Sequence, residues 1–309
     1  MTGPSTSNSV IYDLAKNPIT FDFAHFLAYA RLCFAIAGKD PIFYLSLFAD
    51  SWRNDTPREL EYSLDDRIWR LHNLITPICS VTPAIIGYSV SLDERGRLSD
   101  RTDELMVECD GGVYSIQALI PTFRKAGFDP HLFAAPQVAR QYAERILSTR
   151  PDPVLVSIRQ SSFQSTRNIP RSFLTALIDR LMDLGRSVFV IPDQETDSIR
   201  RDLPPEVVFV DEASFNLPLR LALHEQAPVS ICSASGPTSF ISLAISKPSL
   251  VVVHPTNPEV SVSRPENLSR QGWEVGADQP LPWTPENQIW LWDPDVSATF
   301  ACSAAQSLW

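Results

Sequence analysis

Short apolar runs alternate with longer amphipathic segments between residues 154 and 253. The apolar runs are rich in β-branched residues, which is typical of buried strands. They are Val154–Ile158, Ser187–Ile191, Val207–Val210, Val229–Cys232 and Ser249–Val253, the last strand that we expect. The segments between them place apolar residues at helical spacing, and the predicted helices are Pro170–Leu184, Leu217–Gln226 and one that opens after Ser233–Pro237 and runs through Ile245. Strands that alternate with helices in this way predict a parallel sheet covered on both faces.

The first half of the chain shows the same alternation less regularly. Its expected strands are Val10–Leu14, Ile42–Phe48, Ala84–Ser89 and Met106–Cys109. Its expected helices are Asp22–Ala37, Leu64–Leu74, Ser115–Ala126 and Pro136–Leu147. The Pro-rich segment 148–153 is typical of a hinge. The sequence therefore predicts two Rossmann-like α/β domains, residues 1–150 and 151–309, the second closed by a helix over about residues 294–307.

Composition excludes several classes of protein. With 309 residues, of which 44% are hydrophobic, the chain is long and apolar enough for two cores. No window reaches the roughly 18 apolar residues of a transmembrane helix, and the polar N-terminus does not read as a signal peptide, so we expect a cytoplasmic protein. The net charge of −10 disfavours nucleic acid as a partner. Isolated cysteines and scattered histidines predict neither a disulfide framework nor a metal site.

Polar loops that follow buried strands are the candidate ligand-binding segments, because ligands of open parallel sheets bind beyond the carboxyl ends of the strands. The first loop carries Arg159, Arg167 and Asn168, whose side chains suit a diphosphate. The second carries Asp193 and Glu195, and a carboxylate there can accept hydrogen bonds from ribose hydroxyls. Solvated loops or helix caps would explain the same residues without a ligand.

Glycine is scarce, at 11 residues, about half of the usual frequency, and no dinucleotide or Walker fingerprint occurs. One glycine, however, stands in the strand-to-helix loop that ends with Ser235, Gly236, Pro237, Thr238 and Ser239. Gly236 permits a close approach of backbone to ligand, and the amides and hydroxyls of Thr238 and Ser239 are expected to face an anion at the helix start. A tight strand-to-helix connection is the alternative reading.

Three further residues lie near this expected site. Arg220 stands one helical turn before His224 and can reach a phosphate, whereas His224 is more typical of a core histidine. His254 ends the last predicted strand at the ligand side of the sheet and is a contact candidate.

These segments resemble the donor-binding half of GT-B glycosyltransferases, in particular the heptosyltransferase-like branch. The resemblance is carried by Val154–Ile158, Arg167–Pro170, the motif Ser235-Gly236-Pro237, Lys247-Pro248 and Pro255-Thr256, and it covers about residues 150–256. It implies two Rossmann-like domains facing a cleft and transfer of a sugar from a nucleoside diphosphate donor to a glycan or lipid-linked acceptor, with no metal and no other cofactor. The implied process is polysaccharide biosynthesis, and peripheral contact with a membrane is compatible with it.

The resemblance also implies a base in the first domain that deprotonates the acceptor hydroxyl. Asp22 is the first candidate and His25, one turn further, the second; a first-turn carboxylate that only stabilises the helix is the alternative for Asp22. Asp110-Gly111-Gly112 would line the acceptor cleft or form a turn.

Two other functions fit the same pattern. One is an epimerase of the same fold that acts on the nucleotide sugar itself. The other is a catalytically silent GT-B-like protein that binds or assembles with partners, because Ser239 stands where the resembled family has a histidine.

Overall fold

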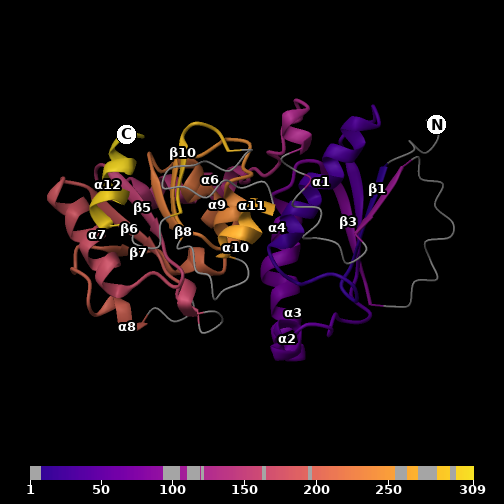
Figure 1. The fold of residues 1–309 in the computed structure, drawn as a ribbon, viewed down its shortest axis with the longest axis horizontal. Coiled ribbons are helices and arrows are strands. Elements are labelled where there is room, and N and C mark those ends of the chain that lie inside the picture. The colour runs from indigo at the N-terminus through magenta and orange to yellow at the C-terminus, as the bar shows by residue number, and fades with distance from the viewer. Residues whose placement is uncertain are drawn as a thin grey trace. The chain divides into compact units, whose positions relative to one another are not determined.

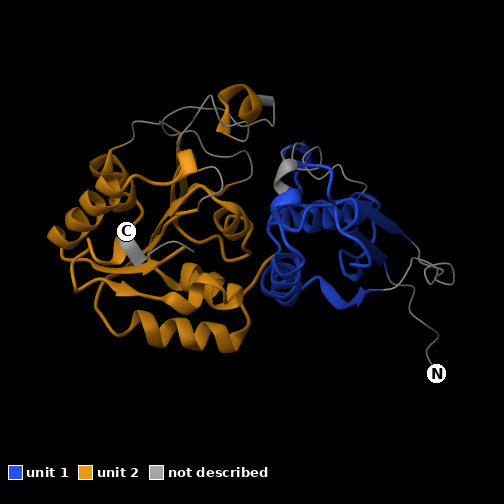
Figure 2. Ribbon diagram, turned by 90° about the horizontal axis from the view of Figure 1, so that it is seen from below, with its two compact units in different colours: residues 1–132 blue, residues 133–309 orange. Residues whose placement is uncertain are grey.

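The computed structural model describes residues 8–92, 105–109, 119, 122–161, 165–193, 197–254, 263–270, 284–292 and 297–309. The chain forms two compact units, Met1–Leu132 and Phe133–Trp309 (Figure 2). Each unit is built on its own parallel sheet, one of four strands and one of six (Figure 1). The α/β fold class with two parallel-sheet domains is thereby confirmed.

The first unit has the strand order β3-β2-β1-β4. Its strands are β1 (Asn8–Asp13), β2 (Phe43–Phe48), β3 (Ile85–Ser91) and β4 (Met106–Cys109). Its helices are α1 (Asp22–Ile36), α2 (Pro57–Glu61), α3 (Leu64–Arg70) and α4 (Thr76–Ser80), and a π-helical turn (Leu71–Ile75) joins the last two. The predicted helix 64–74 thus continues to Ser80.

Aromatic packing fixes α1 on the first sheet. The ring of Tyr12 on β1 lies 4.7 Å from that of Phe23 and 5.3 Å from that of Phe26, measured between centroids. The Tyr12 hydroxyl donates to the Pro18 carbonyl at 2.7 Å, so that this buried ring keeps its polar end paired. The loop between β1 and α1 is consequently held against the strand that precedes it.

The second unit has the strand order β10-β9-β8-β5-β6-β7. Its strands are β5 (Pro153–Ser157), β6 (Ser187–Ile191), β7 (Val208–Phe209), β8 (Ser230–Ser233), β9 (Leu250–Val253) and β10 (Gln288–Leu291). Its α-helices are α6 (Gln137–Leu147), α7 (Arg171–Asp183), α8 (Asp197–Arg200), α9 (Leu217–Gln226), α10 (Gly236–Ile241), α11 (Pro265–Arg270) and α12 (Ala298–Gln306). Two 3₁₀ turns, Ser165–Arg167 and Asp211–Ser214, complete it.

Alternating residues of the second sheet point into two apolar layers. Val154 and Val156 of β5 belong to the core that α7 and α12 close. Leu155, between them, is equally buried and faces the other way, because strand residues alternate between faces. On that side α9 packs with α6. The second sheet is therefore covered on both faces, as its apolar strands predict.

The structure changes two predicted elements. Ser249–Val253 is not the last strand, because β10 pairs with β9 in parallel, Gln288 opposite Leu250. The helix expected to run through Ile245 ends at Ile241, because the residues after it pair with Phe133, whose carbonyl accepts from the Ile245 amide at 2.8 Å. Both changes come from pairing between segments that are distant in sequence.

The two compact units divide the chain between Leu132 and Phe133, and α6 packs against α9 within the second unit. The predicted boundary at residue 150 lies after α6. Most of the predicted helix 115–126 lies outside the described residues. No helix in the described part of the chain combines the length and the apolar character needed to cross a membrane.

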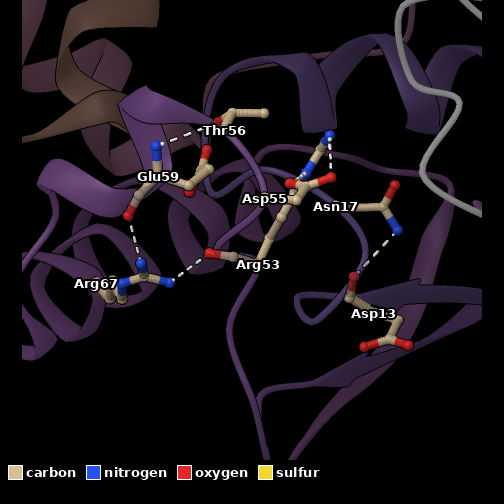
Figure 3. A network of polar contacts seen from close by, with 7 residues as sticks. All are labelled: Asp13, Asn17, Arg53, Asp55, Thr56, Glu59 and Arg67. Carbon is tan, nitrogen blue, oxygen red and sulfur yellow. Dashed lines mark hydrogen bonds and ion pairs between the residues drawn. The ribbon is translucent and has the colours of Figure 1, made fainter.

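Substitution of Arg67 on α3 measures how much one buried guanidinium stabilises the first unit. Its Nη1 donates to the Arg53 carbonyl at 2.8 Å and its Nη2 to the Glu59 carbonyl (Figure 3). Its Nε donates to the Tyr62 carbonyl at 3.2 Å. We expect Arg67→Ala to lower the free energy of unfolding by about 2–4 kcal/mol, because three carbonyls lose a charged donor. Urea unfolding measures the change.

Arg171→Ala is the matched control, since its side chain is 58% exposed and pairs with Asp202 at the surface. It should change the free energy of unfolding by less than about 0.5 kcal/mol. Equal losses in the two variants would show that the three buried hydrogen bonds contribute nothing specific.

Candidate functional site

The candidate site lies at the carboxyl edge of the second sheet. Strands β5, β6, β8 and β9 run parallel and end at Ser157, Ile191, Ser233 and Val253, so their following loops lie at the same edge. Two contacts join these loops directly. Arg167 Nη2 donates to the Ala234 carbonyl at 3.3 Å, and the Gln160 amide donates to Asp193 Oδ2 at 3.0 Å.

The loop after β5 is folded around Asn168. The Asn168 Oδ1 atom accepts from the Ser161 amide at 3.1 Å and from Arg159 Nη1, while its Nδ2 donates to the Ser161 carbonyl at 2.9 Å. Arg159 is buried, whereas Arg167 is only half-buried. Arg159 and Asn168 therefore shape the loop, and Arg167 is the more exposed of its two arginines.

Asp193 also has a supporting role in this arrangement. Its contact with Gln160 ties the loop after β6 to the loop after β5. Its charge also partly offsets the lowering of the Arg220 pKa by burial. Glu195, the other predicted ribose ligand, lies outside the described residues.

The loop after β8 directs part of its polar surface inward. Thr238 Oγ1 donates to the Ser233 carbonyl at 2.8 Å and lies 3.1 Å from Ser235 Oγ, and Thr238 itself is buried. The Ser239 amide donates to the Ser235 carbonyl at 3.0 Å, so this amide, expected to face an anion, is already bonded within the helical turn. Ser235, Gly236 and Pro237 are half-buried and form the accessible part of this loop.

Arg220 and His224 lie on α9, beneath the edge. Arg220 Nη2 donates to Ser157 Oγ at 2.6 Å, and burial lowers the pKa of its guanidinium. Burial and the charge of Arg220 hold the pKa of His224 well below its ordinary value, and the His224 ring lies 4.0 Å from Cys232 Sγ. His224 is a core residue, and Arg220 supports the end of β5 from below.

His254 follows β9 directly and packs against two indoles. Its amide donates to the Leu291 carbonyl at 2.8 Å, and its ring meets the Trp292 ring edge-on with 4.7 Å between centroids. Burial, with Arg167 as a second cause, lowers the pKa of His254 to about 3. Trp290 and Trp292 were missed as neighbours of the site, although their period-two spacing indicates a strand.

The first unit holds the two predicted catalytic residues at the start of α1. Asp22 Oδ2 accepts from Thr20 Oγ1 at 2.7 Å, and Asp22 is half-buried. His25 is buried, and its pKa is lowered by that burial, which the charge of Asp22 partly offsets. Asp22 is therefore the more accessible of the two candidates.

A second carboxylate, which sequence reasoning missed, ends β1 in the same unit. Asp13 is buried, and its Oδ1 accepts from the Ala15 amide at 2.9 Å. Asn17 Nδ2 donates to the backbone carbonyl of Asp13 at 3.1 Å (Figure 3). It also donates to the backbone carbonyl of Cys109 at 2.6 Å, which joins the β1 loop to the end of β4. The segment 110–112 lies outside the described residues.

Among the described residues, no three His, Cys, Asp or Glu side chains gather as a metal site would require.

Solved structures share this fold across nearly the whole chain. ADP-heptose LPS heptosyltransferase II of E. coli superposes with a TM-score of 0.58 at 11% identity, over 98% of this chain and 98% of that one. A family 9 glycosyltransferase of Veillonella parvula superposes with a TM-score of 0.60 at 10% identity, over 98% and 97% of the two chains. The chain therefore has the GT-B fold seen in heptosyltransferases, in a divergent form. No protein-family model matches the sequence, and no curated protein matches it.

Because His254 is buried in its neutral form, the free energy of unfolding depends on pH. Because its pKa is about 3 in the folded chain and about 6.5 when unfolded, the unfolded state binds more protons between these values, and stability falls as the pH drops through this window. We expect this histidine to account for a loss of about 2 kcal/mol between pH 7 and pH 5. His254→Gln should remove that share of the loss in urea unfolding at the two pH values.

His25 and His224 are buried with lowered pKa values too, so part of the pH dependence should remain in the variant. The exposed His72 supplies the control, His72→Gln, which should follow the parent chain. A His254→Gln curve that coincides with the parent at both pH values would contradict the expectation.

Proposed function

We propose that this protein is a glycosyltransferase that moves a sugar from a nucleoside diphosphate donor to a glycan or lipid-linked acceptor. The observation that carries the proposal is the position of Arg167: a half-buried guanidinium at the carboxyl edge of a GT-B sheet, bonded to the backbone beside Ser235 and Gly236. A nucleoside diphosphate needs positive charge at this edge, and a guanidinium binds oxyanions in a fixed orientation.

In this proposal the second unit holds the donor. Arg167 and the half-buried backbone of Ser235 and Gly236 bind the diphosphate, and Arg159 with Asn168 keeps the Arg167 loop in shape. Asp193 and Glu195 are assigned to the ribose side. Charge that develops on the leaving diphosphate is stabilised by the guanidinium, so that the reaction needs no metal or other cofactor.

Asp22 is proposed as the base that takes the proton of the acceptor hydroxyl. The Thr20 hydroxyl fixes one of its carboxylate oxygens at 2.7 Å, which orients the side chain. General base catalysis requires a base held within reach of the proton that it takes, and an oriented carboxylate meets this requirement. Transfer to a glycan of the cell envelope, as part of polysaccharide biosynthesis in the cytoplasm, is the setting that we propose.

A catalytically silent GT-B protein is the second candidate. The observation that favours it is the loop after β8, where the Ser239 amide and the Thr238 hydroxyl are committed to the chain's own carbonyls. Fewer hydrogen-bond donors then remain to stabilise a leaving diphosphate than the sequence suggests.

Binding of a nucleoside diphosphate tests the donor site. In calorimetric titrations with ADP, GDP, UDP, CDP and dTDP we expect one to bind with micromolar affinity. Arg167→Ala should weaken that binding by about 30- to 100-fold, because a charge-assisted hydrogen bond contributes about 2–3 kcal/mol.

Arg186→Ala is the control, because Arg186 precedes β6 at the opposite edge of the sheet and stacks on Trp309 at 3.8 Å. It should bind as the parent does. If none of the five nucleotides binds the parent chain, the glycosyltransferase proposal fails.

Turnover tests the base. With the donor selected by titration and a detergent extract of membrane glycolipids as acceptor, Asp22→Asn should reduce nucleoside diphosphate release at least about 100-fold and leave nucleotide affinity unchanged. His25→Gln should keep most of the activity, because the buried ring is the less accessible group.

Full turnover in Asp22→Asn would remove Asp22 as the base. Nucleotide binding without turnover in the parent chain would favour the silent protein instead.

A further inference from the structure

Three buried hydrogen-bonding atoms at the carboxyl edge of the second sheet have no partner among the described residues. They are Nδ1 and Nε2 of His254 and Nε1 of Trp290. His254 is 5% exposed and Trp290 2%, and their ring centroids are 6.5 Å apart. An unpaired buried polar group costs about 1–3 kcal/mol, so native proteins seldom keep several together without a use for them.

The surrounding contacts hold the imidazole in one place. Trp290 and Trp292 stack on each other with 5.3 Å between centroids, and His254 meets Trp292 edge-on. The bond from the His254 amide to Leu291 fixes the backbone below the ring. Backbone and ring contacts therefore position the side chain without using either ring nitrogen.

The charge state of the ring defines what it can recognise. Its lowered pKa, with burial as the larger cause and Arg167 as the smaller, keeps it neutral at physiological pH. A neutral imidazole has one donor and one acceptor nitrogen. It therefore complements an uncharged group that both donates and accepts, such as a base edge or a hydroxyl, better than it complements a phosphate.

We propose that His254 and the Trp290 indole form a nucleoside subsite, which recognises the uncharged part of the donor while Arg167 binds its diphosphate. This inference rests on the proposed function and extends it, since it assigns nucleotide specificity and diphosphate affinity to different residues. Arg167 supplies affinity for every nucleoside diphosphate, and His254 selects among them.

Two substitutions separate recognition from packing. His254→Phe keeps a ring of similar size and removes both nitrogens, whereas His254→Gln keeps a donor and an acceptor. If the His254 ring serves only for packing, the Phe variant should keep the nucleotide affinity of the parent chain. If the ring recognises the nucleoside, the Gln variant should keep that affinity better than the Phe variant.

The experiment is calorimetric titration of the full chain and both variants with ADP, GDP, UDP, CDP and dTDP. We expect the parent chain to prefer one nucleotide by at least about tenfold over the others. His254→Phe should weaken the preferred nucleotide about tenfold, the effect of one lost hydrogen bond, and bring the five affinities together. His254→Gln should stay within about threefold of the parent.

The thermal midpoint provides an independent measurement. Because His254→Phe removes two unpaired polar atoms from an aromatic environment, the unliganded variant should melt at the same temperature as the parent or higher. His72→Gln, on the exposed surface of the first unit, should change neither the midpoint nor the affinities.

The outcomes distinguish this inference from the function on which it rests. No binding of any nucleotide to the parent chain overturns both. Equal binding of all five by the parent, or a His254→Phe variant that keeps the parent's preference, overturns the subsite alone. A lowered midpoint with unchanged affinities would assign His254 to packing and likewise overturn it.

Discussion

Strands β5, β6, β8 and β9 pair in parallel, and the position of every loop of the candidate site follows from this pairing. Each of these strands is buried on both faces, so its backbone groups must find partners in neighbouring strands. Parallel pairing sends all of their carboxyl ends to one edge. Arg167, Asp193 and His254 come from loops after three different strands, and this geometry alone brings their loops to the same edge.

Burial then divides the polar residues of that edge between two tasks. Arg159, Asn168 and Thr238 use their hydrogen bonds to shape the loops, while Arg167, which we propose as the diphosphate ligand, is half-buried. Below them, Arg220 meets Ser157, and the low polarity of the interior keeps His224 neutral. Such a supporting layer keeps a binding residue in a fixed orientation, as precise recognition of a ligand requires.

The apolar pattern predicted the strands of the second unit closely because those strands lie in the interior of a parallel sheet and carry continuous apolar runs. It missed β10, whose four residues include one polar end, Gln288, and lie in a part of the chain rich in tryptophan. The end of α10 was also mispredicted, because pairing with Phe133 overrides a local helical pattern. For the candidate site, the sequence singled out Arg167 and His254, whose contact with a ligand stays a prediction. It also expected the Ser239 amide to face a ligand, whereas that amide bonds within its own turn.

Local periodicity and side-chain chemistry were enough to predict the α/β class, the order of most strands and helices, and which loops carry the polar residues. Which of those polar residues are buried, and what they bond to, follows from the packing of the folded chain. Hydrogen-bond partners and burial arise between segments far apart in the chain: Arg167 bonds to Ala234, and the ring of His254 packs against Trp290 of β10 and against Trp292. The role of a charged or polar residue depends on those partners, which local pattern does not contain.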